Sequence, residues 1–268
     1  MVINTGVSRL RLTVAAVTDP AKVHEVLFWP VRRLGIRRRV TVASDSLASV
    51  VLVTNRPAQL DHALASFDRQ QYRHKELILV TNGGDFPATR MLQLAARTDV
   101  TCLTTPAEMT LGAALNRGAD AASGRVIAKF DDDDHYGPDH LSESVEAMRR
   151  TGAGVVGKKT YYLYMESTDR TVLIYPGNEG RRVGRVAGGT IVAHRDVFDR
   201  VRFPALNLGE DVAFVRAVER RGFGVHSTEA AGFLQWRAAS GHTWAFDQAD
   251  IERVSDEIGV GHDPDLWT

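Results

Sequence analysis

The 268-residue sequence lacks several features that mark particular classes of protein. Its one cysteine, Cys102, excludes an intramolecular disulfide and any site built from several thiolates. Lys and Arg together number 33, as do Asp and Glu, so no net charge favours nucleic acid or an anionic membrane as a partner. No apolar run approaches the ~20 residues that cross a bilayer, and the first residues do not have the order of a signal peptide. These absences predict a cytoplasmic protein.

The first 46 residues differ in character from the rest. Five arginines crowd the stretch Arg32–Arg39, next to the apolar run at residues 26–30. A solvated helix face or a linker explains such a run of charge. The alternative is a surface that meets a second copy of the chain, a polyanionic acceptor or the inner face of a membrane at its periphery. We therefore assign residues 1–46 to a basic extension or linker.

From residue 48 onward, β-branched apolar runs alternate with segments of helical periodicity. Strands are expected at 49–54, 76–81, 100–103 and 126–130, with helices between them. This alternation predicts an α/β fold with a Rossmann-like, mostly parallel sheet flanked by helices. After residue 150 the alternation loosens, and residues 154–175 suggest strands of a smaller mixed or antiparallel region. We expect one domain with two halves, residues 47–150 and residues 151–268.

Four consecutive aspartates, Asp131–Asp134, follow the expected strand at 126–130. Ligands of parallel sheets bind at the carboxyl ends of the strands, where this run lies. Adjacent carboxylates repel each other, and a hard divalent cation that also binds phosphate oxygens relieves that repulsion. A solvated loop and a calcium loop are alternatives, but the apolar strand anchors the run, and Tyr136 stands where a calcium loop needs a ligand. The run predicts a Mn²⁺ or Mg²⁺ site beside a diphosphate.

The stretch VIAKFDDDDHYGPDHL also resembles the acidic D-x-D-type motif of bacterial family 2 glycosyltransferases, which have the GT-A fold. SVVLVTNRPAQLDHAL resembles the first strand and turn of that family, and AGGTIVAHRDVFDRVRFPALNLGED resembles its acceptor segment and catalytic ED pair. GHTW resembles a C-terminal motif of one bacterial subset. The resemblance implies transfer of a sugar, with inversion, from a nucleoside-diphosphate sugar to a hydroxyl. A UDP-sugar is the first expectation for the donor, and a glycan, a lipid-linked molecule or another hydroxyl compound for the acceptor.

The resemblance further implies that residues 47–150 bind the nucleotide sugar and that residues 151–268 bind the acceptor and contain the catalytic group. It also implies roles for individual residues. Residues expected to contact the nucleotide sugar are Thr54, Asn55, Arg56, Asn82, Leu111, Gly112, Asn116, Asp131 and Asp132. The expected metal ligands are Asp131, Asp133 and His242, because neutral imidazole binds divalent metals as carboxylates do. Asn82 follows the second strand, near where the family often has an aspartate that reads uracil, so the base of the donor stays open.

Asp211 is the expected general base, because the acceptor hydroxyl needs a proton acceptor within hydrogen-bond reach. Its place at the start of a predicted helix also fits a simple cap, and Glu210 is the rival for the catalytic role. Two other functions stay open. A sugar nucleotidyltransferase also needs a metal beside phosphates, although TNRPAQ is a poor phosphate loop. A non-catalytic nucleotide-sugar-binding module is the third.

Overall fold

The computed structural model describes residues 38–239 and 248–266. The chain divides into two units, residues 1–33 and 34–268, and every described residue belongs to the second.

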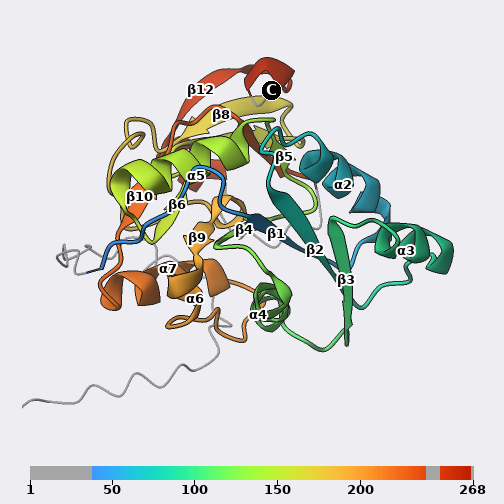
Figure 1. Ribbon diagram of the computed structural model, residues 1–268. Coiled ribbons are helices and arrows are strands. Elements are labelled where there is room, and N and C mark those ends of the chain that lie inside the picture. Colours follow the sequence, from blue (N-terminus) through green and yellow to red (C-terminus); the bar gives the residue numbers. More distant parts are fainter. Residues whose placement is uncertain (1–37, 240–247, 267–268) are drawn as a thin grey trace, which may run out of the picture. The chain divides into compact units, whose positions relative to one another are not determined.

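A seven-stranded sheet forms the centre of this unit (Figure 1). Its strands are, in spatial order, β10 (Val225–Ser227), β6 (Val155–Gly157), β9 (Val192–His194), β4 (Val126–Phe130), β1 (Ala48–Thr54), β2 (Lys75–Asn82) and β3 (Val100–Thr105). β4, β1, β2 and β3 run parallel to one another, and β6 runs parallel to β10. Only β9, between β4 and β6, is antiparallel to its neighbours. The predicted mostly parallel sheet is confirmed.

Helices cover both faces of this sheet. Figure 1 shows α2 (Leu60–Asp68) and α5 (His140–Thr151) on one side, and α4 (Leu111–Ala121), α6 (Arg195–Phe198) and α7 (Glu210–Arg220) on the other. α3 (Ala88–Ala95) lies next to β3. Gly118 allows α4 to pack closely on β1, because a Cβ at this position would lie 2.4 Å from Val51 Cγ1. α5 ends at Gly152, whose left-handed conformation (φ 64°) closes the helix.

The core lies between these helices and the sheet. β1 and β4 are buried over almost their whole length, which explains their continuous apolar sequences. Val50, Leu52 and Leu77 are all 0% exposed. Burying each such side chain contributes about 1.5–3 kcal/mol, so this part of the sheet forms a rigid base for the loops at its edge.

A second sheet has five strands in the order β12 (Ser255–Val260), β8 (Arg170–Ile174), β7 (Tyr161–Met165), β11 (Phe233–Arg237) and β5 (His135–Tyr136). Only β11 and β7 pair in parallel, so this is the predicted mixed region. One strand lies elsewhere than expected, and another was not expected at all. β6 belongs to the large sheet, and β5, directly after the acidic run, belongs to the small one. Strands of two or three residues carry too little periodicity to reveal their partners.

The remaining short elements are η1 (Pro57–Gln59), η2 (Gly188–Thr190), α8 (Gln248–Glu252) and η3 (Pro264–Leu266). Before β1, Val40 and Val42 are buried, and Val40 N donates to Gly152 O at 3.1 Å. The segment from residue 38 therefore packs on the domain. No helix in the described ranges is both long and apolar enough to cross a membrane.

Candidate active site

The carboxyl ends of β1, β2 and β4 lie at one edge of the large sheet. Thr54 at the end of β1 is level with Thr81 on β2, and Leu52 is level with Phe130 at the end of β4. The acidic run therefore starts beside the loop that follows β1. This is the edge at which parallel sheets bind ligands, and the run lies where the sequence predicts it.

Arg56 joins the β1 loop to the acidic run. Its guanidinium bonds both carboxylate oxygens of Asp132 and lies 2.8 Å from Asp133 Oδ2. Thr54 Oγ1 donates to Asp132 Oδ2 at 2.5 Å. Asp132 is buried and already bonded within the protein, whereas the Asp133 side chain is 34% exposed. Asp133 is therefore the more accessible of the two to a ligand.

Lys129 brings a buried positive charge to the same place. It lies within β4, and its Nζ is 2.5 Å from Asp131 Oδ1. Burial opposes the charge, but Asp131, Glu210 and Asp211 together hold the pKa of the Lys129 ammonium above its usual range. The positive charge of Lys129 thus interacts with three carboxylates from two distant parts of the chain, the acidic run and α7.

Asp134 has an excess of negative charge around it. Its Oδ1 accepts a hydrogen bond from Trp236 N at 3.1 Å, and its buried Oδ2 has no hydrogen-bond partner in the described parts of the chain. Burial, and then Asp133 and Asp131, raise the pKa of the Asp134 carboxyl well above its usual range. The pKa of Asp133 is also raised, by burial first and then by Asp131, against the effect of Arg56. Buried polar atoms without a partner are uncommon, so this site is short of positive charge.

The donor atoms present fit a hard divalent cation, because carboxylate oxygens are the ligands that Mg²⁺ and Mn²⁺ prefer. Asp131 and Asp133, each about one-third exposed, are the described residues that would hold it. Within residues 38–239 and 248–266, no cluster of three or more His, Cys, Asp or Glu side chains has the arrangement of a metal site. The predicted third ligand, His242, lies outside the described residues.

Gly188 and Gly189 bring the acidic run and α7 together. A Cβ at Gly189 would lie 2.6 Å from Asp134 Oδ2 and 2.9 Å from Asp131 Oδ2, and one at Gly188 would lie 2.6 Å from Asp211 Oδ2. The Tyr136 hydroxyl donates to Gly189 O at 2.9 Å and accepts from Asp131 N at 2.8 Å. Only glycine fits this approach, which gathers three carboxylates around one turn.

Glu210 and Asp211 form the first turn of α7. Gly209, with a φ of 75°, is the N-cap, so Asp211 is the second residue of the helix and does not cap it. Asp211 is half-buried with Oδ2 against the Gly188 turn, whereas Glu210 is only 5% exposed. Burial raises the pKa of the Glu210 carboxyl to about 7, with Lys129 lowering it and Asp211 raising it. Of the pair, Asp211 is the more exposed, and its Oδ2 lies against the Gly188–Gly189 turn.

Several residues expected at the nucleotide have partners within the protein. The Asn82 amide donates to Met109 O at 2.8 Å and accepts from Thr105 Oγ1 at 2.9 Å. Asn116 bonds the backbone of Phe203 with both ends of its amide. Asn55 is exposed in the β1 loop.

The start of α4 is likewise held by the protein itself. A Cβ at Gly112 would lie 1.9 Å from Pro204 O, and Leu111 N donates to Asn207 Oδ1. Contact of Asn82, Leu111, Gly112 and Asn116 with a nucleotide stays a prediction.

Three residues of this site were not among those expected from the sequence: Lys129, Tyr136 and Trp236. A lysine inside an otherwise apolar strand is a usable signal, because a buried ammonium needs a carboxylate nearby. Tyr136 and Trp236 reach the site through the pairing of β5 and β11, which no local pattern reveals. In the arginine-rich stretch, residues 32–37 lie outside the described residues, and Arg38 Nε bonds Arg221 O at 3.1 Å.

The sequence pattern described as Glycosyl transferase family 2 matches residues 49–202, more than half of the chain. The chain belongs to this family. The matched stretch includes the β1 loop, the acidic run and the Gly188–Gly189 turn. A comparison with curated protein sequences found no match.

Solved structures of two named proteins share the fold. One is S. aureus TarS 1–349 in complex with UDP-GlcNAc, 13% identical with a TM-score of 0.56, where the match covers 73% of this chain and 60% of that one. Another is the mannosyltransferase PcManGT from Pyrobaculum calidifontis in complex with GDP-Man and Mn²⁺, 16% identical with a TM-score of 0.57, covering 84% of this chain and 64% of that one. The family 2 chain thus spans less than two thirds of these proteins, and the likeness establishes a GT-A-like fold.

Proposed function

We propose that this family 2 protein is a glycosyltransferase that binds a nucleoside-diphosphate sugar with a divalent cation and transfers the sugar, with inversion, to an acceptor hydroxyl. The observation that carries the proposal is the meeting of Asp131, Asp134 and Asp211 around the Gly188–Gly189 turn at the carboxyl edge of the sheet. A transferase of this kind needs both a place for a leaving diphosphate and a base beside it, and this turn joins the two.

The donor side is formed by the β1 loop and the acidic run. Asp131 and Asp133 would hold Mn²⁺ or Mg²⁺, which when bound stabilises negative charge on a leaving diphosphate. Arg56 fixes the loop that contains Thr54 and Asn55 by bonding Asp132, so the loop is ordered before a nucleotide arrives. The related structures hold UDP-GlcNAc in TarS and GDP-Man with Mn²⁺ in PcManGT, so both bases are candidates for the donor.

The acceptor side provides the base. Asp211 would take the proton of the acceptor hydroxyl at Oδ2, the oxygen that lies against the turn. Asp211 lies in the first turn of α7, and its charge is one of those that act on the Lys129 ammonium. Glu210 is less suited, because it is only 5% exposed and so is less accessible to an acceptor hydroxyl.

Calorimetry of UDP and GDP binding tests the donor site. Affinity for one of them should rise at least about tenfold when Mn²⁺ replaces EDTA, since a cation relieves the repulsion between the carboxylates and the diphosphate. Asp133→Asn should remove most of this difference, whereas Asp61→Asn, which changes an exposed carboxylate on α2, should not. Equal affinity in EDTA and Mn²⁺ would contradict the metal role.

Two assays separate the alternative functions. Mn²⁺-dependent hydrolysis of a nucleotide sugar, or transfer of the sugar, supports a glycosyltransferase. Release of pyrophosphate from a nucleoside triphosphate and a sugar phosphate would identify a sugar nucleotidyltransferase instead. Tight donor binding with neither reaction would leave a nucleotide-sugar-binding module.

We further propose that the protein works in the cytoplasm and that Arg32–Arg39 form an association surface for a membrane or for a second copy. Because Val40 and Val42 are buried, the appropriate truncation removes residues 1–37. Donor hydrolysis should survive it, while membrane sedimentation or oligomeric state should change. Loss of hydrolysis in a truncated protein that is still folded would contradict this assignment.

A further inference from the structure

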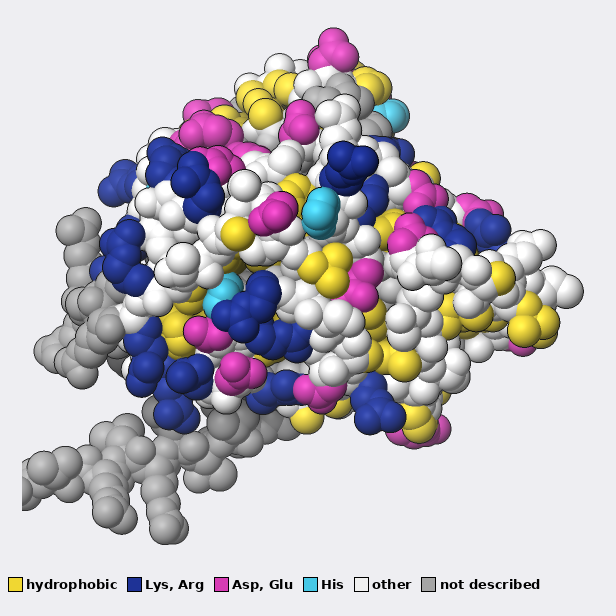
Figure 2. Space-filling model, in the orientation of Figure 1, with side chains coloured by type: hydrophobic (Ala, Val, Ile, Leu, Met, Phe, Trp, Pro, Cys, Tyr) yellow, Lys and Arg dark blue, Asp and Glu magenta, His cyan; other side chains and the backbone are white. Residues whose placement is uncertain are grey.

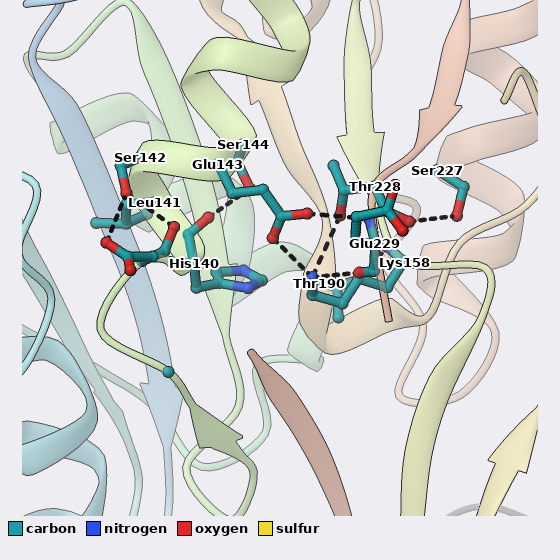
Figure 3. A network of polar contacts seen from close by, with 12 residues as sticks. His140, Leu141, Ser142, Glu143, Ser144, Lys158, Thr190, Ser227, Thr228 and Glu229 are labelled. Atoms are coloured by element: carbon teal, nitrogen blue, oxygen red, sulfur yellow. Dashed lines mark hydrogen bonds and ion pairs between the residues drawn. The ribbon is translucent and has the colours of Figure 1, made fainter. Parts of the chain in front are cut away.

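A buried polar network fixes the link between β6 and β7. In the large sheet β9, which follows the Gly188–Gly189 turn, separates β6 from β4 and the acidic run. Figure 3 shows Lys158 at the centre of this network. Lys158 Nζ lies 2.9 Å from Glu143 Oε2, 2.6 Å from Glu229 O and 3.3 Å from Thr228 Oγ1. All three ammonium hydrogens therefore have acceptors, and the side chain is completely buried.

This network places the next residue, Lys159. Lys158 N donates to Thr190 Oγ1 at 2.8 Å, in the same short helix as Gly188 and Gly189, and Lys159 N donates to Ser227 Oγ at 2.9 Å. The Lys159 ammonium lies 3.3 Å from the centre of the Tyr175 ring. The backbone and the side chain of Lys159 are therefore both held in position.

Tyr175 is itself held in a strained conformation. Its φ is 48°, in the left-handed region that non-glycine residues seldom adopt. Its carbonyl accepts hydrogen bonds from Thr160 Oγ1 at 2.7 Å and Asn178 Nδ2 at 2.9 Å. Strain of this kind persists where the surroundings enforce it, and it is concentrated at sites that bind ligands.

Lys159 and Arg185 are two cations of this region. No ion pair joins Lys159 or Arg185 to an Asp or Glu within the described residues, although both side chains are half-buried. Burial, and then the charge of Arg185, lower the pKa of the Lys159 ammonium to about 7. Arg185 also acts on Arg216 of α7, whose pKa is lowered by burial first. Figure 2 shows Lys and Arg side chains gathered over α7, with some Asp and Glu side chains among them.

Arg185 of the cationic group and the proposed base Asp211 both act on one hydroxyl, that of Tyr161. The Tyr161 hydroxyl is buried, which raises its pKa; Arg185 lowers that pKa, while Tyr175, Asp134 and Asp211 raise it. One hydroxyl is therefore within electrostatic range of Arg185 and Tyr175 as well as of the site carboxylates. Arg185 is also only three residues before Gly188, against which Asp211 Oδ2 lies.

We propose that Lys159 and Arg185 bind an anionic group of the acceptor, a phosphate first, and so present the acceptor hydroxyl to Asp211. The proposal rests on the proposed function and adds the chemical class of the acceptor. An anion could also come from the donor diphosphate. On the donor side, however, Arg56 and Lys129 already lie beside the carboxylates. Lys159 follows β6, and Arg185 precedes Gly188, so both belong to the proposed acceptor side.

The test compares glucose 6-phosphate with glucose, two probes that share the same sugar and differ only in the phosphate group. Their binding to the full chain is measured by calorimetry, with Mn²⁺ and a saturating concentration of whichever of UDP or GDP binds. Glucose 6-phosphate should bind at least about tenfold more tightly than glucose, because charge-assisted hydrogen bonds are the strong ones. Lys159→Met and Arg185→Gln should each remove most of that difference.

Three controls accompany these variants. Lys159→Arg keeps the charge and should retain the preference for the phosphate. Arg149→Gln removes an exposed charge on α5 that is paired with Glu146, and it should behave as the unaltered protein. Nucleoside diphosphate binding should be unchanged in Lys159→Met.

The outcomes separate the inference from the proposed function. Equal binding of the two sugars, or an undiminished preference in folded Lys159→Met and Arg185→Gln, overturns the inference. Weakened nucleoside diphosphate binding in Lys159→Met also overturns it and assigns the cations to the donor. If neither UDP nor GDP binds, the proposed function fails, and the same variants decide the anion site by phosphate binding to the protein alone.

Discussion

The two sides of the Gly188–Gly189 turn differ in how their charges are balanced. On the donor side, aspartates are in excess, and Arg56 and Lys129 offset only part of their charge. On the other side, Lys159 and Arg185 have no carboxylate partner among the described residues. Neither imbalance serves stability, since an uncompensated buried charge costs free energy. The first suits a cation with a diphosphate, and the second suits an anion.

The consecutive residues Lys158 and Lys159 show the same contrast. Lys158 is buried and has three acceptors, so its charge is fully used inside the protein. The Lys159 ammonium instead lies over the ring of Tyr175, and the positive charge of Arg185 repels it. The local sequence does not distinguish the two lysines. Their surroundings indicate a structural role for Lys158 and a ligand-binding role for Lys159.

A substitution in the Gly188–Gly189 turn is expected to disturb both sides at once. Gly189→Ala puts a methyl group where Asp134 Oδ2 and Asp131 Oδ2 now approach, so the carboxylates must move. A displacement of this size at reacting groups costs about 10²-fold in rate. Donor hydrolysis and transfer should fall by that factor. Gly259→Ala, where nothing lies within 4 Å of the new Cβ, is the matched control and should leave both rates unchanged.

Removal of Lys158 sharpens the contrast between the lysines. Lys158→Met leaves Glu143 without its ammonium and opens the link between α5 and β6, so unfolding free energy should fall by about 3 kcal/mol. Lys159→Met should change stability little. Urea denaturation of both variants measures the difference. Equal losses would show that the two lysines share one structural role.

His140 provides a pH-dependent test of the same network. Burial, and then Lys158, hold the pKa of its imidazole well below 6.5, and neither ring nitrogen has a hydrogen-bond partner among the described residues. Below pH 6.5, His140 is protonated in the unfolded chain but stays neutral in the folded protein. The free energy of unfolding therefore falls as the pH falls. The loss is about 1.4 kcal/mol for each pH unit below that value.

In His140→Leu this contribution is absent. Urea denaturation at pH 5, 6 and 7 should give a smaller loss of stability with acid for the variant than for the unaltered protein. Parallel curves for the two proteins would show that His140 already takes up a proton in the folded state.

The sequence was sufficient for features set by local patterns. The four strands of the parallel sheet follow from β-branched runs such as residues 49–54, and the position of Asp131–Asp134 follows from the rule for strand ends. It was insufficient where distant segments meet. Three features depend on long-range packing: the electrostatic effect of Glu210 and Asp211 on Lys129, the hydrogen bond from Trp236 N to Asp134, and the place of β6 in the large sheet.

The most direct test of the proposed mechanism is transfer by Asp211→Asn. The amide keeps the size of the side chain but cannot accept a proton, so loss of the base should lower the transfer rate by about 10²–10⁴-fold. Metal-dependent nucleoside diphosphate binding should be nearly unchanged, because Asp211 is on α7 and not in the acidic run. Full transfer activity in this variant would contradict the role of Asp211, and Glu210→Gln would then test the neighbouring carboxyl in the same assay.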